Sequence, residues 1–536
     1  MVVGAGHNGL VAASVLARAG MRVCVLESSD QLGGACRTEY PFAAAPRLGV
    51  STGAYLLGPM PPEVLARTGL RVRLIPRRPH GYFLLEDARP VALGLRGGGV
   101  NLRDQDRARL PAFDAAVDAI RDDLAPLWLK EAVTLEESVR HVRATEAPGL
   151  GVPVREVYRR LAFGSVGDFF ALLDLEDSAL TAVLASDGLV GSARGYAEPG
   201  TGMNFVAHNM LRLPAGDRWS PGRPSDPEGP PPAPLAAWQL VEGGMGAITA
   251  GLAAIVRELG GVVAAATPAR GIETEGGRVV AVRAEGGRVR APIAILATDP
   301  VRALALCADP SLAPLAARVR ALASPGTSLK VNLALRALPR VVAAEHLPVV
   351  GTSEVALRGT VHIVPTGEVL ERLERARRAA LAGRTPDPFN ALIDVYTHTA
   401  ADDSLRDPDG RHTMSLFVQW VPPRMAQTAA EAFARDLVRG PVARVLPDLP
   451  GLIEDMLVLP PLGIEARFGI TGGHIHHLEN AHAFDRRLPC RTPVRGLLLG
   501  GAGCHPAGSV IGCAGLIAAE AALEDWGLSG SARPGA

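Results

Sequence analysis

The first 27 residues read as a strand, a glycine turn, a helix and a second strand that ends in an acid. Gly4, Gly6 and Gly9 form a G-x-G-x-x-G pattern between the first strand and the helix, and Glu27 ends the second strand. Glycines at this spacing allow a tight turn, a close approach of the backbone to a pyrophosphate and close helix–strand packing, while the acid binds a ribose hydroxyl. The glycine pattern alone is a weak signal. With strand, helix and acid in register, it predicts a dinucleotide-binding unit.

A second glycine pair narrows the choice of dinucleotide. Gly33 and Gly34 follow Glu27 closely, with Arg37 and Thr38 after them. This arrangement resembles the FAD proteins of the glutathione-reductase-like superfamily. The stretches GGMGAIT and GGAGCHP each lack the third glycine of the G-x-G-x-x-G pattern, so the sequence shows no second complete motif. We therefore expect FAD as the cofactor, without a separate nicotinamide domain.

Composition bounds the class of protein. A chain of 536 residues with 48% hydrophobic and 21% charged residues is long enough for more than one domain and apolar enough for a large core. Zero formal net charge and a pI near 7.2 exclude the basic footprint of a nucleic-acid binder. The six cysteines show no C-x-x-C spacing, so neither a zinc site nor a redox disulfide is readable, and free thiols are typical of a reducing cytoplasm.

The N-terminal residues bear on cellular location and on cofactor affinity. Residues 1–26 are apolar but lack a positively charged start, so we expect no targeting signal, and no apolar run elsewhere is long enough to span a bilayer. Only Met1, Val2 and Val3 precede Gly4, whereas strands usually have about 5–6 residues. This predicts either an earlier natural start or a weakened cofactor affinity. We expect a cytoplasmic protein, with peripheral membrane contact and homo-oligomer formation left open.

The rest of the chain divides by pattern. Residues 105–215 are expected to be mostly helical, and the seven prolines within residues 221–234 predict an extended loop. From Gly243 onward, a helix precedes a β-hairpin marked by EGG, and residues 326–335 alternate as a strand. Residues 367–382 read as a charged, exposed helix. One helical face in the first region carries Phe113, Val117, Ile120, Leu124 and Leu127.

Six stretches together carry a family resemblance. They are VVGAGHNGLVAASVLARAG, GGACRTE, GGMGAITAGLA, SLKVNLAL, GGHIHHLEN and GAGCHPAGSVIGCAG. The chain resembles the phytoene-desaturase-like branch of the FAD-dependent amine oxidase superfamily, and within it the group named for pyridine nucleotide-disulphide oxidoreductase domain-containing protein 2. The motifs extend from residue 1 to about residue 523. That group's name implies a redox disulfide, but this sequence has no cysteine pair that could form one.

The resemblance implies an α/β fold with two intertwined domains. The first is a discontinuous, glutathione-reductase-like FAD-binding Rossmann domain. The second is an α+β substrate domain with a mostly helical first part. The FAD-binding domain is expected at residues 1–60, 235–310 and 486–527, and the substrate domain at residues 61–234 and 311–485.

The resemblance also assigns cofactor-binding residues. In the tail, the chain from Gly501 to Ser509 is expected to pass the flavin, and the helix beginning near Val510 is expected to point its N-terminus at the pyrimidine ring. A helix N-terminus stabilises negative charge on a reduced flavin by about 0.3–1 kcal/mol. The alternative is an ordinary glycine-capped surface helix. The full predicted set is Gly4, Gly6, Asn8, Gly9, Glu27, Gly33, Gly34, Arg37, Ala269, Gly501, Gly503, Val510 and Ile511.

Two positions depart from the family pattern. Relatives often carry an acid in the tail motif that holds the ribityl chain, and here that position is Ala502. Amine oxidases proper often place an aromatic side chain where Ser509 stands. With aromatic residues at only 4% of the chain, these departures weaken the expectation of an amine substrate.

Lys330 is the first candidate catalytic residue. Lysine and arginine together number 55, and only Lys130 and Lys330 are lysines, which leaves 53 arginines. An ammonium is compact and loses its charge on burial more readily than a guanidinium. Lys330 shares a strand face with Asn332 and Ala334, and the resemblance places it where several amine oxidases hold a lysine that reaches flavin N5 through a water. We predict a role in proton transfer or oxygen handling; the alternative is a strand lysine that faces bulk water.

The histidines form a second candidate group. His474 and His476 are expected on one strand face, with His477 opposite. No cysteine or carboxylate completes a recognisable metal spacing, so we expect no metal. Lining a substrate cavity and a purely structural role both remain open. His505 follows the tail glycines and is a candidate acid/base catalyst, if the tail passes the flavin.

These features predict an FAD-dependent oxidoreductase that acts on a small molecule. It would transfer a hydride from a substrate carbon to flavin N5 and pass the electrons to oxygen or a quinone. The resemblance favours a largely apolar substrate and a desaturation or isomerisation. A flavin amine oxidase is one alternative. The other is a non-enzymatic partner-binding protein of the GDP-dissociation-inhibitor type, because one fold can host unrelated functions.

Overall fold

A computed structural model describes most of the chain. The described residues are 1–58, 60–75, 81–85, 90–93, 101–209, 238–342, 344, 351–365 and 367–527. The predicted proline-rich loop at 221–234 lies outside them.

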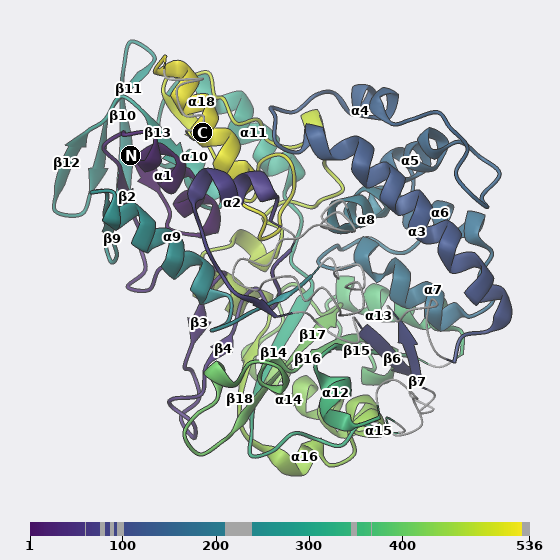
Figure 1. The fold of residues 1–536 in the computed structure, drawn as a ribbon. Helices are drawn as coiled ribbons and strands as arrows, with labels where there is room; N and C mark the ends of the chain where they lie inside the picture. The colour runs from purple at the N-terminus through teal and green to yellow at the C-terminus, as the bar shows by residue number, and fades with distance from the viewer. Residues whose placement is uncertain are drawn as a thin grey trace, which may run out of the picture.

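Segments from the start, middle and end of the chain form one parallel sheet. Its five strands follow the order β19-β13-β1-β2-β9, and every neighbouring pair is parallel. The purple, teal and yellow elements of these segments lie together at the upper left of Figure 1. The predicted α/β class is therefore confirmed. The strands are β1 (Val2–Val3), β2 (Cys24–Leu26), β9 (Val262–Ala264), β13 (Ala294–Leu296) and β19 (Leu497–Leu499).

Three helices pack against one another beside this sheet. They are α1 (His7–Arg18), α9 (Gly246–Glu258) and α18 (Cys513–Asp525). The helices α1 and α18 cross so closely that a Cβ at Gly515 would overlap the carbonyl oxygen of Asn8. The crossing is also hydrogen-bonded, because the Gly515 N–H donates to Asn8 Oδ1 at 3.3 Å.

The last helix starts later than the sequence indicated. It begins at Cys513 rather than near Val510, and Gly512 precedes it with a φ of 75°. That left-handed conformation favours glycine and interrupts a right-handed helix. Val510 and Ile511 are buried in the bend before the helix.

A hairpin and one more strand form a small antiparallel sheet. It follows the order β10-β11-β12, and the predicted hairpin is its β11–β12 pair. The strands are β10 (Ala269–Glu275), β11 (Arg278–Ala284) and β12 (Gly287–Arg290).

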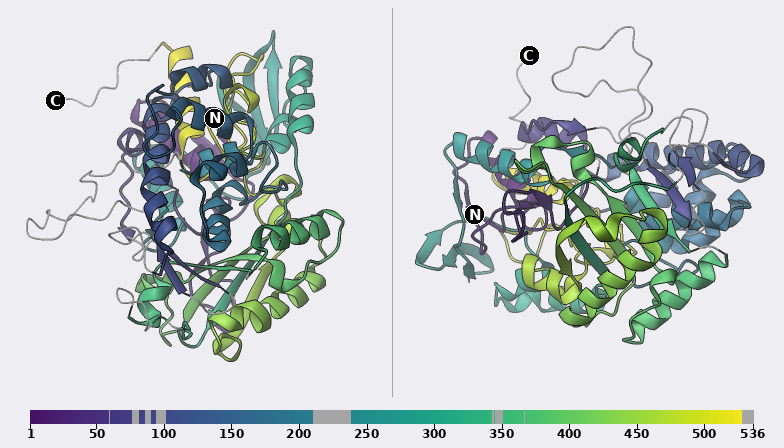
Figure 2. Two further views of the ribbon diagram at one scale, coloured as in Figure 1. Left: turned by 90° about the vertical axis from the view of Figure 1, so that its right-hand side faces the viewer. Right: turned by 90° about the horizontal axis from the view of Figure 1, so that it is seen from below.

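A seven-stranded mixed sheet forms the second large layer, in the order β18-β14-β17-β16-β15-β6-β7. Figure 2 shows this sheet with its helices below the parallel-sheet unit in the left-hand view. The predicted alternation of residues 326–335 is confirmed, since Leu329, Val331 and Leu333 share a hydrophobic core that excludes Lys330 and Asn332. The strands are β6 (Gly81–Leu85), β7 (Pro90–Leu93), β14 (Ser328–Leu335), β15 (Thr360–Val364), β16 (Leu392–Tyr396), β17 (His412–Gln419) and β18 (Ile453–Leu459).

A block of helices between residues 104 and 209 completes the fold and appears in blue in Figure 1. Its core packs Phe113 against Phe169, Phe170 and Phe205. The predicted apolar face of the first helix is buried, and the helical expectation is confirmed up to Asn209. The helices are α3 (Asp104–Leu124), α4 (Leu135–His141), α5 (Val154–Phe163), α6 (Val166–Leu173), α7 (Ser178–Ala185) and α8 (Thr201–Asn209).

The predicted exposed helix is α13 (Val369–Leu381), and it is amphipathic rather than wholly exposed. Val369, Leu373 and Ala376 are buried on one side, because an apolar stripe recurs every three or four residues among the charges. The other helices are α2 (Pro62–Thr68), α10 (Pro300–Ala305), α11 (Ala313–Leu322), α12 (Ser353–Leu357), α14 (Gln427–Leu437), α15 (Ala443–Val445), α16 (Leu449–Leu452) and α17 (Pro461–Phe468). Within the described ranges, no helix has the length and apolar character needed to cross a membrane.

The α1–α18 crossing gives a stability prediction. In an open helix, Gly515→Ala would be favourable by about 1 kcal/mol through helix propensity. Here the added methyl overlaps Asn8, so we expect a loss of about 1–3 kcal/mol in the free energy of unfolding. Urea unfolding monitored by circular dichroism measures the change. Gly287→Ala is the control, since no atom lies within 4 Å of a Cβ there. A stabilised Gly515→Ala variant would show that the helices do not cross this closely.

Candidate active site

The first glycine motif has two tightly packed positions and one open position. A Cβ at Gly4 would lie 2.8 Å from the carbonyl oxygen of Ala297, and one at Gly9 would overlap the carbonyl oxygen of Gly4. A Cβ at Gly6 would meet only Gly33 O, at 4.0 Å. The missing side chain at Gly6 thus leaves room for a ligand to approach the backbone.

The second glycine pair lies beside the first. Gly33 donates its N–H to Ala5 O at 2.9 Å, and Gly6 and Gly33 pair as a short parallel bridge. Gly6 is the N-cap of α1 and makes no side-chain capping hydrogen bond. The first N–H groups of a helix have no partner within the helix, so this end is a ready site for an anion such as a pyrophosphate. These residues fit a dinucleotide.

Glu27 stands at the end of β2, beside the glycine turn. Its carboxylate accepts hydrogen bonds from the N–H groups of Ala5 at 2.8 Å and Ser29 at 2.9 Å. Thr267 donates its N–H to the Glu27 carbonyl at 2.7 Å, which holds the segment leading to Ala269 against the same strand end. Glu27 is therefore fixed where the ribose of a dinucleotide would lie.

Two other predicted cofactor residues have partners within the protein. The Asn8 side chain accepts from Gly515 and helps to fasten α18 to α1. Arg37 is buried, pairs with Glu39 at 3.3 Å, and its guanidinium lies 5.0 Å from the ring centroid of Phe468. Arg37 Nε has no hydrogen-bond partner, so part of the guanidinium stays available.

The tail glycines lie against the segment that follows β13. A Cβ at Gly501 would lie 2.5 Å from Thr298 O, and one at Gly503 would lie 2.8 Å from the ring of Pro300. Ile511 lies near Gly58, where a Cβ would be 3.4 Å from its side chain. The structure thus brings the tail to the carboxyl edge of the parallel sheet, close to the chain after β4 (Val50–Ser51).

Arg487 holds the tail loop in place, and it was not identified from the sequence. Its guanidinium is almost fully buried and pairs with no carboxylate in the described part of the chain; burial lowers its pKa to about 10. It donates hydrogen bonds to six main-chain carbonyl oxygens, which belong to His476, Leu478, Glu479, His482, Ala502 and Cys504.

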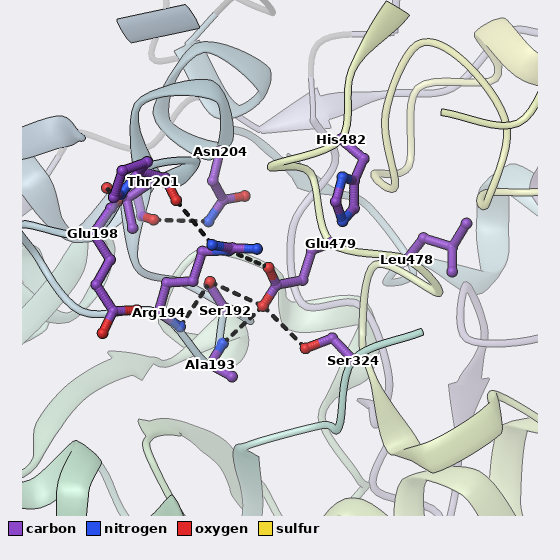
Figure 3. Close-up of polar contacts among 12 residues, drawn as sticks. Ser192, Ala193, Arg194, Glu198, Thr201, Asn204, Ser324, Leu478, Glu479 and His482 are labelled. Carbon is purple, nitrogen blue, oxygen red and sulfur yellow. Dashed lines mark hydrogen bonds and ion pairs between the residues drawn. The ribbon is translucent and has the colours of Figure 1, made fainter. Parts of the chain in front are cut away.

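Glu479 holds the same loop from its other side (Figure 3). The buried carboxylate accepts from Arg194 Nε at 2.8 Å, the Ala193 N–H at 3.0 Å, Ser324 Oγ at 3.1 Å and Ser192 Oγ at 3.2 Å. Burial alone would raise the pKa of Glu479, but His474, Arg194 and the Ala193 N–H hold it below its ordinary value. Two loops distant in sequence are thereby joined.

Lys330 is buried in an aromatic setting. On β14, its Nζ lies 4.1 Å from the ring centroid of Tyr55 and 5.1 Å from that of Phe417. Burial lowers the pKa of Lys330 to about 7, and no carboxylate in the described part of the chain opposes this shift. The alternative of a strand lysine in bulk water is therefore wrong. Tyr55 and Phe417 were not identified from the sequence, where single aromatic residues carry no signal.

Apolar and aromatic side chains surround this lysine. Tyr55 and Phe417 belong to one hydrophobic cluster that also includes Leu240 and reaches Trp238 and Ile475. Beyond it, the His208 ring lies 5.7 Å from Trp238 and 5.1 Å from His476. The surroundings of Lys330 are thus largely apolar, with imidazoles at their border.

The predicted histidine strand does not exist. A short 3-10 turn, Thr471–Gly473, precedes His474, and the three histidines follow in further turns because Gly472 and Gly473 both have positive φ. Burial lowers the pKa of His474 to about 4 and that of His476 well below its usual value. His477 Nδ1 lies 3.6 Å from Asp299. Among the described residues, no three His, Cys, Asp or Glu side chains form a group that could hold a metal ion.

His505 packs apart from Lys330. Its ring stacks on Trp128 at 5.8 Å and tilts against Phe484 at 5.4 Å, and its Nε2 lies 3.2 Å from Leu127 O. Burial lowers the pKa of His505 to about 4. These partners belong to the core of the helical block, whereas those of Lys330 form a different cluster. The structure does not bring the two predicted catalytic side chains into a shared contact, and an acid/base role for His505 stays a prediction.

Comparison with known proteins finds a matching family model, related proteins and a similar solved structure. A family model described as flavin containing amine oxidoreductase matches residues 9–354. An uncharacterised protein of Mycobacterium tuberculosis is 29% identical over 98% of this chain and 96% of its own length. Pyridine nucleotide-disulfide oxidoreductase domain-containing protein 2 of Rattus norvegicus is 28% identical over 98% of this chain and 93% of its own length. A solved structure of a putrescine oxidase double mutant matches with a TM-score of 0.58, at 17% identity and 98% coverage of each chain.

These similarities carry different weight. The putrescine oxidase structure shares the fold, and at 17% identity it shows no more than that. The family model covers well over half of the chain, which confirms the resemblance to FAD-dependent amine oxidases and the expected FAD cofactor. The chain belongs to the family of flavin-containing amine oxidoreductases.

Proposed function

We propose that this protein is an FAD-dependent dehydrogenase that removes a hydride from a carbon of a largely apolar small molecule. The bound FAD supplies the hydride acceptor at N5, and oxygen or a quinone would take the electrons. The observation that carries the proposal is the buried Lys330, which lies against the rings of Tyr55 and Phe417. The chain also has a glycine cradle, the motif of Gly4, Gly6 and Gly9, which is open at Gly6.

Lys330 suits proton transfer. An amine with a pKa of about 7 is populated in both protonation states at neutral pH, which is the condition under which a general acid or base works best. No carboxylate in the described residues fixes the ammonium in its charged form. Its Nζ can therefore hold a proton or release one at little cost.

The apolar wall supports a substrate with an apolar body. The cluster of Tyr55, Phe417, Leu240 and Trp238 excludes water and offers large hydrophobic surfaces. A desaturation in the manner of the phytoene-desaturase-like branch fits such a wall. A flavin amine oxidase is the second candidate, favoured by the description of the family model.

The glycine cradle gives a cofactor prediction. Gly6→Val would place a branched side chain in the open space above the turn, while only Gly33 O lies within 4.0 Å of its Cβ. We expect unchanged thermal stability of the FAD-free protein and at least a tenfold weaker FAD affinity, measured by the visible flavin absorbance that remains after gel filtration. A wild-type protein that stays colourless after FAD addition would favour the partner-binding alternative. A Gly6→Val variant that stays yellow would place the cofactor elsewhere.

The burial of Lys330 gives a pH-dependent stability prediction. Lysine in an unfolded chain has a pKa near 10.4, against about 7 in this protein. Between these values the unfolded chain binds the additional proton, so burial of Lys330 destabilises the fold most below pH 7 and ceases to do so near pH 10. Lys330→Met is expected to gain up to roughly 4 kcal/mol in the free energy of unfolding at pH 6, with the gain shrinking as the pH rises to 10.

Urea unfolding of the purified protein across this pH range measures the difference. Lys130→Met is the matched control, because Lys130 is exposed and is the only other lysine. A stability difference for Lys330→Met that is small and independent of pH would show that the amine is not buried.

The catalytic role of Lys330 has its own test. The FAD-loaded protein is reduced by light and mixed with oxygenated buffer, and flavin absorbance follows reoxidation. General acid–base groups typically contribute on the order of 10²-fold or more to a rate, so we expect Lys330→Met to slow reoxidation by about that factor and to remove an inflection near pH 7. Equal rates in the two proteins would leave Lys330 with a structural role only.

A further inference from the structure

We propose that the substrate carries a carbonyl group, and that Tyr55, Asn332 and Lys330 together form the subsite that binds its oxygen. The inference rests on the proposed function, because it assigns a chemical class to the molecule oxidised next to Lys330. It comes from buried hydrogen-bond donors that have no acceptor in the described protein.

Asn332 supplies the first unused donor. It follows Lys330 on β14 by two residues, so both side chains emerge on the same face of the sheet. The residue is fully buried, and its Oδ1 accepts a hydrogen bond from Ser415 Oγ at 2.9 Å on the neighbouring strand. This bond sets the orientation of the amide, and Nδ2 has no hydrogen-bond partner.

Tyr55 supplies the second unused donor. Its hydroxyl is buried near Ser415 and Asn332, but no partner meets hydrogen-bond geometry. Burial raises the pKa of the Tyr55 phenol far above its ordinary value, against a smaller opposing effect of those two neighbours, so the hydroxyl keeps its proton. The backbone of Tyr55 is fixed as well, because its carbonyl oxygen lies 2.6 Å from His398 Nε2.

Lys330 completes the group. Its Nζ lies over the Tyr55 ring at 4.1 Å, beside the Asn332 amide along the strand. An amide N–H, a phenol O–H and an amine N–H are all donors, and a buried donor without an acceptor destabilises the fold. Two such donors, Asn332 Nδ2 and the Tyr55 hydroxyl, lie beside the Lys330 amine. This grouping is unusual, since buried polar groups are nearly always hydrogen-bonded.

An acceptor oxygen is the group that would satisfy these donors together. A carbonyl oxygen offers two lone pairs and no proton, whereas an alkylammonium offers only donors and would repel a protonated Lys330. The surrounding cluster of Tyr55, Phe417 and Trp238 would hold the apolar body of the same molecule. The substrate class is therefore an apolar ketone or related carbonyl compound, rather than an amine.

Binding of matched probes to the FAD-loaded protein tests the inference. The probes share a naphthalene body and differ in one group: methyl 2-naphthyl ketone, 1-(2-naphthyl)ethylamine and 2-isopropenylnaphthalene. Titration calorimetry measures each dissociation constant. A carbonyl oxygen accepts two hydrogen bonds that contribute about 1 kcal/mol net each, and 1.4 kcal/mol is tenfold in affinity, so we expect the ketone to bind about thirtyfold more tightly than either analogue.

Variants assign the effect to the subsite. Asn332→Leu and Tyr55→Phe each remove one donor at similar size and are expected to weaken ketone binding by roughly five- to tenfold. Each is also expected to reduce the downshift of the carbonyl stretching frequency seen by Raman difference spectroscopy, because donation to the oxygen weakens the C=O bond and one donor is lost. The control is Thr413→Val, which removes a buried hydroxyl on the same strand as Ser415, at a residue that pairs in the strand register with Ala334 rather than with Asn332.

The outcomes separate this inference from the proposed function. Tighter binding of the amine, or a ketone affinity unchanged by Asn332→Leu and Tyr55→Phe, would overturn the carbonyl subsite. The proposed dehydrogenase function would still stand if another substrate reduced the flavin. A weaker FAD affinity in both variants, without a change in ketone binding, would show that the donors serve the flavin instead. Tight, donor-dependent ketone binding to a protein whose flavin no substrate reduces would support the subsite and contradict the enzyme.

Discussion

The site depends on one buried guanidinium that binds only the backbone. Removing a charge from water costs several kcal/mol, and Arg487 has no carboxylate among the described residues to offset this. Its six main-chain carbonyl partners do so instead, and they come from two loops, residues 476–482 and residues 502–504. Without this cation those carbonyls would lose their partners in the interior, and the tail glycines would lose the contacts that tie them to the loop of residues 476–482.

Glu479 gives the same loop its second anchor, with the opposite sign. Its carboxylate accepts hydrogen bonds from N–H and O–H groups of residues 192–194 and of Ser324, so the loop is fixed between the tail on one side and these two segments on the other. The position of His476 next to His208 follows from these two anchors. The imidazoles at the border of the cluster around Lys330 are therefore positioned by two buried charges, those of Arg487 and Glu479.

The features that local sterics determine were the easiest to predict from the sequence. The glycine cradle and the alternation around Lys330 could be read directly, because turn geometry and the two-residue period of a strand leave a pattern in the chain. The histidine strand was wrong because three alternating residues are too few to distinguish a strand from the turns that Gly472 and Gly473 impose. Arg487 could not be found at all, since its partners are backbone carbonyls and any residue type supplies those. The donors Tyr55 and Asn332 come together only through tertiary packing, which the periodicity of a sequence does not reveal.

The parallel sheet is built from strands that are nearly 500 residues apart along the chain, since β1 pairs with β13 and β13 with β19. When only the first half of the protein has been synthesised, the glycine motif is already present. The strands β13 and β19 of its sheet are still missing. Contacts this remote in sequence form slowly and leave apolar edges exposed in the meantime. We expect the nascent chain to engage chaperones until residue 499 emerges, and the flavin to be acquired only after synthesis is complete.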